Sequence, residues 1–77
     1  MNRQQRNRLN ELIEKIEDIV NEIQEMAEDE QEKYDNMPEG LQDSDRGQAI
    51  SEAAYNLQQA ADDLSSWCDD TRNNLEI

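Results

Sequence analysis

The spacing of the apolar residues constrains the fold most, because these residues recur in steps of three and four along two long stretches of the chain. In the first stretch, the a and d positions of a heptad hold Leu9, Leu12, Ile16, Ile19, Ile23 and Met26. The adjoining e position holds Ile13, Val20, Ala27 and Tyr34. About three residues in seven are apolar, which is typical of a helix that packs inside a bundle. The spacing predicts a helix over about residues 3–35.

The second stretch repeats this arrangement with smaller side chains. Its a and d positions hold Ile50, Ala53, Leu57, Ala60, Leu64 and Trp67, and its e position holds Ala54, Ala61, Cys68 and Leu75. Alanine lets two helix axes approach closely while the larger side chains of the first stretch fill the gap. We predict a second helix over about residues 45–75. The expected core and oligomer contacts are Leu12, Ile16, Ile19, Ile23, Leu57, Ala61, Leu64 and Trp67.

The segment between the two stretches holds the only Pro and Gly residues of the chain. Pro38 disfavours a helix at the residues before it, so the first helix is expected to end there. Gly40 can take a left-handed turn conformation. A turn over residues 36–44 is short enough to make the two helices antiparallel neighbours. The sequence therefore predicts an all-α hairpin that forms one domain over residues 1–77.

The start of the second helix carries two informative positions. Ser44 or Asp43 is expected to act as its N-cap, because both side chains accept hydrogen bonds from backbone N–H groups of a first helical turn. Gly47 then falls inside the helix, where glycine costs about 1 kcal/mol relative to alanine. Propensity does not explain this glycine, so we interpret it as a mark of close backbone contact.

Size and composition favour association of two chains. The chain has 77 residues, of which 34% are apolar, and a core of this size supplies only a few kcal/mol. An apolar face that takes up three of every seven residues is also broader than one neighbouring helix can cover. We therefore expect a homodimer in which two hairpins form a four-helix bundle, burying the d and e positions of both chains.

Negative charge is concentrated in one part of the chain. Fourteen carboxylates and only two lysines lie between Glu11 and Asp45, in a chain whose net charge is −13. Such a surface either keeps the protein soluble or receives a basic partner, and carboxylates at helical spacing can imitate the phosphates of a nucleic acid. Exposed Tyr55 is a further candidate contact. The candidate partner-binding residues are Glu22, Glu25, Glu28, Asp29, Glu32, Asp35 and Tyr55.

Basic residues are few and gather at the N-terminus. Arg3, Arg6 and Arg8 form the only basic cluster, so direct binding of nucleic acid is disfavoured. These arginines lie at the positive end of the predicted helix dipole, which is unfavourable. In an antiparallel hairpin, Asp69 and Asp70 are expected to lie beside them and compensate their charge.

The sequence offers little for catalysis or cofactors. The chain has no His and one Cys, which removes the commonest general base and excludes a structural zinc site. Asp43-Ser44-Asp45 begins like a calcium loop, but Gln48 and Ala54 occupy the positions that need Gly and Glu. We expect no cofactor, no metal ion and no enzymatic activity.

One enzyme class remains an alternative. All-helical nucleotide pyrophosphohydrolases bind Mg²⁺ through Glu-x-x-Glu pairs, and the first helix contains four such pairs: Glu11/Glu14, Glu14/Glu17, Glu22/Glu25 and Glu25/Glu28. These glutamates are expected to face solvent. The second helix offers Asp62 and Asp63 without the matching spacing. A solvated helix face therefore accounts for the pairs more simply.

The same residues indicate a compartment. No apolar run reaches the length of a membrane span, and the polar start is not followed by the apolar segment of a signal peptide. A lone Cys68, which cannot form an internal disulfide, is typical of a reducing environment. Cys68 and Trp67 are expected on the inner face of the second helix. We expect a cytoplasmic protein with no membrane partner.

The residues from Glu32 to Gly47, with the turn Asn-Met-Pro-Glu-Gly-Leu-Gln, carry a resemblance to a known group. The chain resembles small acidic helical proteins that bacteriophages and prophages of Gram-positive bacteria encode. This resemblance implies a phage origin, a bacterial host cytoplasm and inhibition of a host protein, and it assigns no functional residues. The leading hypothesis is a non-enzymatic inhibitor or decoy for a host defence or nucleic-acid-processing protein. The alternatives are a structural or adaptor oligomerisation module and the magnesium-dependent hydrolase.

Overall fold

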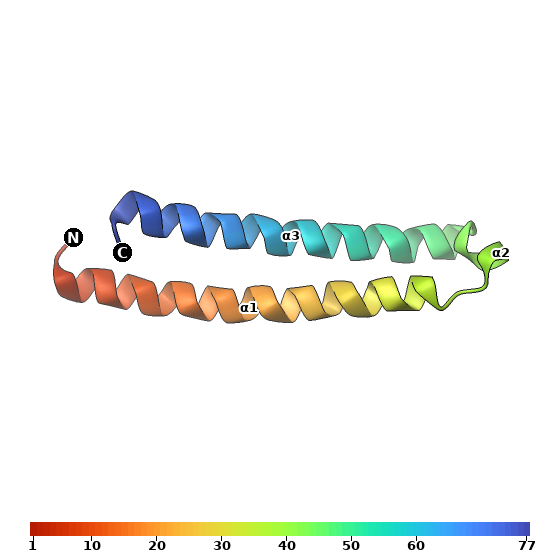
Figure 1. Cartoon of the computed structure of the whole chain (residues 1–77), viewed down its shortest axis with the longest axis horizontal. Helices are drawn as coiled ribbons and strands as arrows, with labels where there is room; N and C mark the ends of the chain where they lie inside the picture. The colour runs from red at the N-terminus through yellow and green to blue at the C-terminus, as the bar shows by residue number, and fades with distance from the viewer.

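Two long antiparallel helices make up almost the whole protein (Figure 1). The computed structural model describes all 77 residues, with α1 over Arg3–Asp35, α2 over Glu39–Gln42 and α3 over Asp45–Leu75. The two chain ends lie at the same end of a rod that measures 59 × 16 × 12 Å (Figure 1). The predicted all-α hairpin is therefore confirmed, and both long helices have the bounds that the apolar spacing predicts. The short α2 was not predicted.

The ends of α1 are defined by local hydrogen bonds. At the N-terminus, the side chain of Asn2 accepts a hydrogen bond from the backbone N–H of Gln5 at 2.8 Å, and the Gln5 side chain accepts one from the N–H of Asn2 at 2.9 Å. This reciprocal pair is a capping box, which satisfies two otherwise unpaired N–H groups. At the other end, Asn36 is the C-cap, and Pro38 follows it. A helix cannot easily continue into proline, so α1 ends here.

The connection differs from the expected glycine turn. Gly40 has no positive φ and lies inside α2, so it does not use the left-handed conformation that glycine allows. Pro38 instead begins a new helical turn, because its carbonyl accepts hydrogen bonds from the N–H groups of Leu41 and Gln42 at 2.8 and 3.1 Å. The chain therefore reverses direction through α2 and its flanking residues, without a left-handed residue.

The start of α3 explains the unusual glycine. Ser44 is the N-cap, and its hydroxyl oxygen accepts a hydrogen bond from the N–H of Gly47 at 3.2 Å. Gly47 is buried beneath α2. A Cβ atom at this position would lie 2.5 Å from the carbonyl oxygen of Leu41 and closer still to that of Gln42. The close backbone contact inferred from the sequence is thus present, because only glycine lets the connection pack against the first turn of α3.

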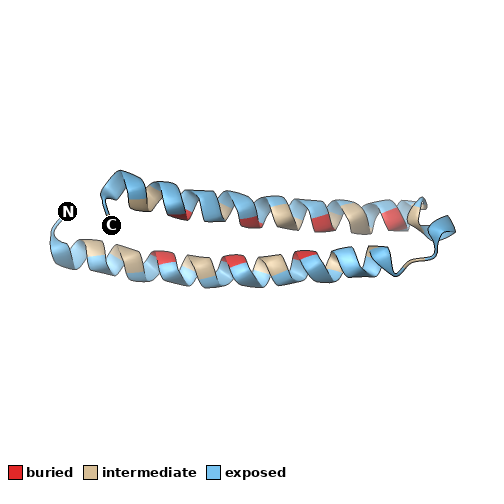
Figure 2. Cartoon of the chain, viewed as in Figure 1, coloured by how far each residue is buried: buried red, intermediate tan, exposed pale blue.

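The core lies along one line of each long helix. The buried apolar residues are Ile13, Val20 and Ala27 of α1 and Ala54, Ala61 and Cys68 of α3. Within each helix these residues are seven apart, and their bands face each other across the hairpin (Figure 2). All six occupy the e position. Small side chains at this position of α3 let the two helices approach closely along this line.

This placement corrects the expected division of contacts. The sequence assigned the d and e positions to an interface between chains, whereas the e position is buried inside a single hairpin. The a position is half-buried at Ile16, Ile23, Leu57 and Leu64. Among the predicted core and oligomer residues, Ala61 is buried, but Leu12, Ile19 and Trp67 are exposed in the single chain. Trp67 therefore does not lie on the inner face beside Cys68.

Candidate functional site

The six predicted partner-binding carboxylates form one exposed surface on α1. They occupy exposed c, f and g positions, and we call them the acidic surface: Glu22, Glu25, Glu28, Asp29, Glu32 and Asp35. None of them forms an ion pair. The three ion pairs of the structure join Arg8 to Glu11, Lys33 to Glu30, and Arg72 to Glu17. The acidic surface therefore carries charge that the protein leaves uncompensated.

This charge also opposes the dipole of α1. The C-terminal end of a helix carries a partial negative charge, which favours cations and disfavours carboxylates, by about 0.3–1 kcal/mol for each charge in the last turn. Glu32 and Asp35 lie in the last turn of α1, where Lys33 is the only cation. The first turn of α1 contains Arg3 and Arg6 and no acidic residue. The arrangement of charge in α1 is therefore the reverse of the one that stabilises a helix.

Tyr55 is exposed on α3, as the sequence predicts, and the structure brings it near the acidic surface. Its exposed fraction is 64%, the largest among the large apolar side chains of the chain. Tyr55 and Glu28 line the same hollow of about 380 Å³, together with Gln31 and Gln58. This hollow combines an aromatic ring, a carboxylate and two amides, which is the chemistry of a polar protein contact. The proximity of Tyr55 to Glu28 depends on the register of the two helices.

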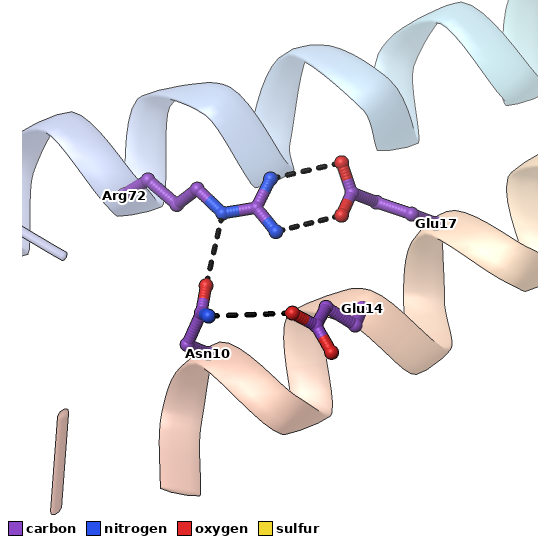
Figure 3. A network of polar contacts seen from close by, with 4 residues as sticks. All are labelled: Asn10, Glu14, Glu17 and Arg72. Carbon is purple, nitrogen blue, oxygen red and sulfur yellow. Dashed lines mark hydrogen bonds and ion pairs between the residues drawn. The ribbon is translucent and has the colours of Figure 1, made fainter. Parts of the chain in front are cut away.

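A polar network joins the helices near the chain ends (Figure 3). The guanidinium of Arg72 donates two hydrogen bonds to the carboxylate of Glu17, at 2.6 and 2.8 Å, and its Nε donates one to the side chain of Asn10 at 3.2 Å. Asn10 in turn donates to Glu14 at 3.4 Å. The hydrogen bonds from Arg72 lower the pKa of Glu17, and those to Glu17 raise the pKa of Arg72.

This network replaces the predicted compensation of the N-terminal arginines. Asp69 and Asp70 form no ion pair with Arg3, Arg6 or Arg8, so that prediction is wrong. Both aspartates are exposed at outward positions of α3, whereas Arg72 lies at the b position and points toward α1. Sequence reasoning missed the pair that Arg72 forms with Glu17. Both residues occupy a b position, which lies beside the buried e position on each helix. This placement could have predicted the pair from the sequence.

Cys68 is the only thiol of the chain, and it is enclosed between the two long helices. The Cys68 thiol is completely buried, and burial raises its pKa, with the nearby Glu17 charge adding to the effect. A protonated, enclosed thiol is a poor nucleophile. No group of three or more His, Cys, Asp or Glu side chains is arranged to hold a metal ion. The three pockets of the structure are open hollows along the hairpin, and their linings contain no cluster of acid, base and nucleophile.

A second surface lies on the side of the hairpin where the d positions point. Its most exposed large side chains are Leu12, Ile19, Met26 and Trp67, with exposed fractions of 39%, 49%, 55% and 48%. We call these four residues the open apolar face. A groove of about 830 Å³ adjoins this face at Met26 and is lined by Met26, Ala53 and Leu57 together with Asp29, Glu30, Lys33 and Asn56. An apolar surface of this length is unusual on a monomeric protein and is typical of an interaction site.

Comparisons with protein-family models, with curated proteins and with solved structures each find no match to this chain. None of the helices has a stretch that is both long and apolar enough to cross a bilayer. The acidic surface and the open apolar face are consequently the two features from which a function can be derived.

Proposed function

We propose that this protein binds a basic surface of another protein through its acidic surface and has no enzymatic activity. The observation that supports this most strongly is the position of Glu32 and Asp35 at the unfavourable end of the α1 dipole, where neither forms an ion pair. Such an arrangement lowers the stability of the protein itself, and stability is commonly lost where function requires it. A surface needed only for solubility could carry its charge anywhere on the outer faces.

The target class follows from the chemistry of the surface. Carboxylates at helical spacing on a long rod offer a row of negative charges, comparable to the phosphates that basic grooves of nucleic-acid-binding proteins receive. We propose that the partner is a host protein with such a groove, either a defence protein or a nucleic-acid-processing protein. The proposed mechanism is occlusion of that groove. The proposed setting is the cytoplasm of a Gram-positive host, with a phage origin, as the resemblance of the turn region implies.

Charge reversal at three positions tests this proposal. The variant Glu28→Lys/Asp29→Lys/Glu32→Lys removes the centre of the acidic surface, and it is expected to keep the fold because lysine suits the C-terminal end of α1. A matched control, Asp62→Lys/Asp63→Lys/Asp70→Lys, makes the same change in net charge on exposed positions of α3. The wild-type protein and both variants are immobilised and incubated with lysate of a Gram-positive bacterium, and the captured proteins are identified by mass spectrometry.

The wild-type protein and the control are expected to retain the same basic protein, and the acidic-surface variant is expected to lose it. Capture should also weaken between about 50 mM and about 500 mM NaCl, because screening shortens the range of the attraction. Equal capture by both variants would contradict the proposal. Circular dichroism of each variant checks that the helical hairpin is intact.

A second candidate function is an oligomerisation module, which the open apolar face favours. In this case, two hairpins associate into the homodimeric four-helix bundle proposed from the sequence, and the charges only keep the assembly soluble. The two candidates differ in what they require. An adaptor depends on apolar contacts such as those of Ile16, Ile23 and Leu57 and tolerates charge reversal on α1, whereas the binding protein does not tolerate it.

A further inference from the structure

The geometry places the open apolar face on one side of the hairpin. Both helices contact each other through the e position, and they run antiparallel, so their a and d positions fall on the same side. The groove next to this face is lined by Met26 from α1 and by Ala53 and Leu57 from α3, which shows the two helices contributing to one surface. The hollow on the opposite side is lined by Ala27, Ala54 and Tyr55 together with Glu28, Gln31, Ser51 and Gln58.

The open side carries little negative charge for so acidic a chain, and the carboxylates in the lining of its groove are Asp29 and Glu30. Of the 20 carboxylate side chains, Glu30 is the only one at an a or d position of α1 or α3. Glu30 is paired with Lys33 at 2.6 Å. A basic partner would select a surface that carries carboxylates. A second copy with the same net charge of −13 requires the opposite, namely a docking face with few carboxylates.

The exposed area agrees with an interface of standard size. The chain exposes 5787 Å², whereas a compact monomer of the same mass, 9.0 kDa, exposes about 4,900 Å². The difference of about 900 Å² is close to the area of about 800 Å² that each partner buries in a standard interface. Six buried apolar residues also form a very small core for 77 residues. Covering the open side would supply both the missing burial and the missing core.

We infer that the open apolar face is the docking site for a second copy of this chain. Leu12, Ile19, Met26 and Trp67 of each copy become buried between two hairpins, while the e positions stay inside each hairpin. Apart from Asp29, which lines the groove, the acidic surface lies on outer positions and remains free, so the dimer presents two such surfaces. This inference rests on the self-association proposed above and assigns it a face. It is independent of whether the acidic surface binds a basic protein.

The single tryptophan gives a direct test on the unmodified protein. Trp67 is the only Trp in the chain and is 48% exposed in a single copy. Light scattering and Trp67 fluorescence are followed from about 1 µM to about 1 mM protein, a range that covers micromolar to millimolar dissociation constants. A mass of twice 9.0 kDa, reached together with a blue shift of the Trp67 emission, is expected. A dimer without a shift would overturn the assigned face, and a mass that stays at 9.0 kDa would overturn self-association as well.

Two matched variants locate the interface. Ile19→Glu places a charge at the centre of the open apolar face, and Tyr55→Glu places one on an exposed residue of the opposite side. Ile19→Glu is expected to weaken dimerisation at least tenfold, and Tyr55→Glu is expected to leave it unchanged. Dimerisation by Ile19→Glu at wild-type strength would exclude this face. If Ile19→Glu unfolds, the concentration dependence of the wild-type emission still decides the question. The charge-reversal variant of the acidic surface should remain dimeric, which separates this inference from the proposed binding function.

Discussion

Gly47 shows how a single position can be determined by its surroundings and not by its own secondary structure. Glycine is a poor helix former, yet this one lies in the first turn of a 31-residue helix. The backbone carbonyls of Leu41 and Gln42 occupy the space that any side chain would need. Ser44 completes the junction by capping α3 through the N–H of Gly47. The direction of α3 relative to the connection therefore depends on the missing Cβ atom.

The substitution Gly47→Ala is expected to destabilise the hairpin by about 1–3 kcal/mol, because overpacking against two fixed carbonyls outweighs the helix propensity of alanine. Gly40→Ala serves as the control. Its Cβ would meet nothing within 4 Å and its backbone is helical, so alanine should stabilise the protein by about 0.4–1 kcal/mol. Urea unfolding followed by circular dichroism measures both. A neutral Gly47→Ala would mean that the connection moves aside at little cost.

The two long helices differ in how their charges suit their dipoles. In α3, Asp45 lies in the first turn and Arg72 in the last, which is the favourable arrangement. In α1, arginines occupy the start and carboxylates the end, which is the unfavourable one. Arg72 additionally ties α3 to Glu17 of α1 with a pair of parallel hydrogen bonds, a strong and directional contact. The stability of the hairpin therefore depends more on α3 and on this contact than on the intrinsic preference of α1.

The contact between Arg72 and Glu17 predicts a specific pH dependence. The pKa of Glu17 is lowered in the folded state, so its contribution to stability is present above the ordinary pKa of glutamate, about 4.3, and is lost as the pH falls through the lowered value. Glu17→Gln should therefore melt at a lower temperature than the wild type at pH 7. This gap should start to narrow below the ordinary glutamate pKa and close once the pH is below the lowered pKa of Glu17, where the wild-type carboxylate is protonated.

Glu14→Gln is the matched control for this pH series. Glu14 lies on the same helix but accepts only a long hydrogen bond of 3.4 Å from Asn10, and it contacts no arginine. Its substitution should change the melting temperature little at any pH. A Glu17→Gln gap that is as large at pH 3 as at pH 7 would show that the loss arises from packing of the side chain and not from its charge.

The molecule as a whole combines a thin core with strong self-repulsion. The rod is only 12 Å thick along its shortest axis, and six apolar side chains are buried. Most of its net charge of −13 lies on α1 and the connection, where fourteen carboxylates and two lysines fall between Glu11 and Asp45. Repulsion among these charges acts over about 10 Å at 0.1 M salt, which exceeds the distance between neighbouring helical turns. Long-range electrostatics should consequently affect the folded state more than in an ordinary domain of this size.

Added salt is expected to stabilise the protein. Raising NaCl from about 0.01 M to about 1 M shortens the screening length from about 30 Å to about 3 Å, so the repulsion between carboxylates fades and the melting temperature at pH 7 should rise. The variant Glu28→Lys/Asp29→Lys/Glu32→Lys is six units less negative and should show a smaller rise. Thermal unfolding followed by circular dichroism measures both. A melting temperature that falls with salt would mean that the attraction between Arg72 and Glu17 outweighs the repulsion.

The sequence was sufficient to predict the hairpin, because local signals determine helices of this kind. Apolar spacing located both long helices, the Pro and Gly residues located the connection, and Ser44 was one of two predicted caps. The outward positions of the acidic surface and of Tyr55 followed from the same heptad, since a residue's place on a helix depends only on its number. These features need no knowledge of what the helix packs against.

The contacts between helices could not be obtained in this way, because they depend on rotation and register. An apolar stripe three positions wide can pack against a neighbouring helix through its a, d or e position. The small side chains at the e position of α3 allow the closest approach, and the e position is the buried one. That rotation exposes Leu12, Ile19 and Trp67, which the sequence had assigned to the core or to an oligomer interface. The pairing of Arg72 with Glu17 and the nearness of Tyr55 to Glu28 likewise depend on how the helices slide past one another. A heptad position says where a residue lies on its own helix. A contact between helices depends in addition on how the two helices are rotated and shifted relative to each other.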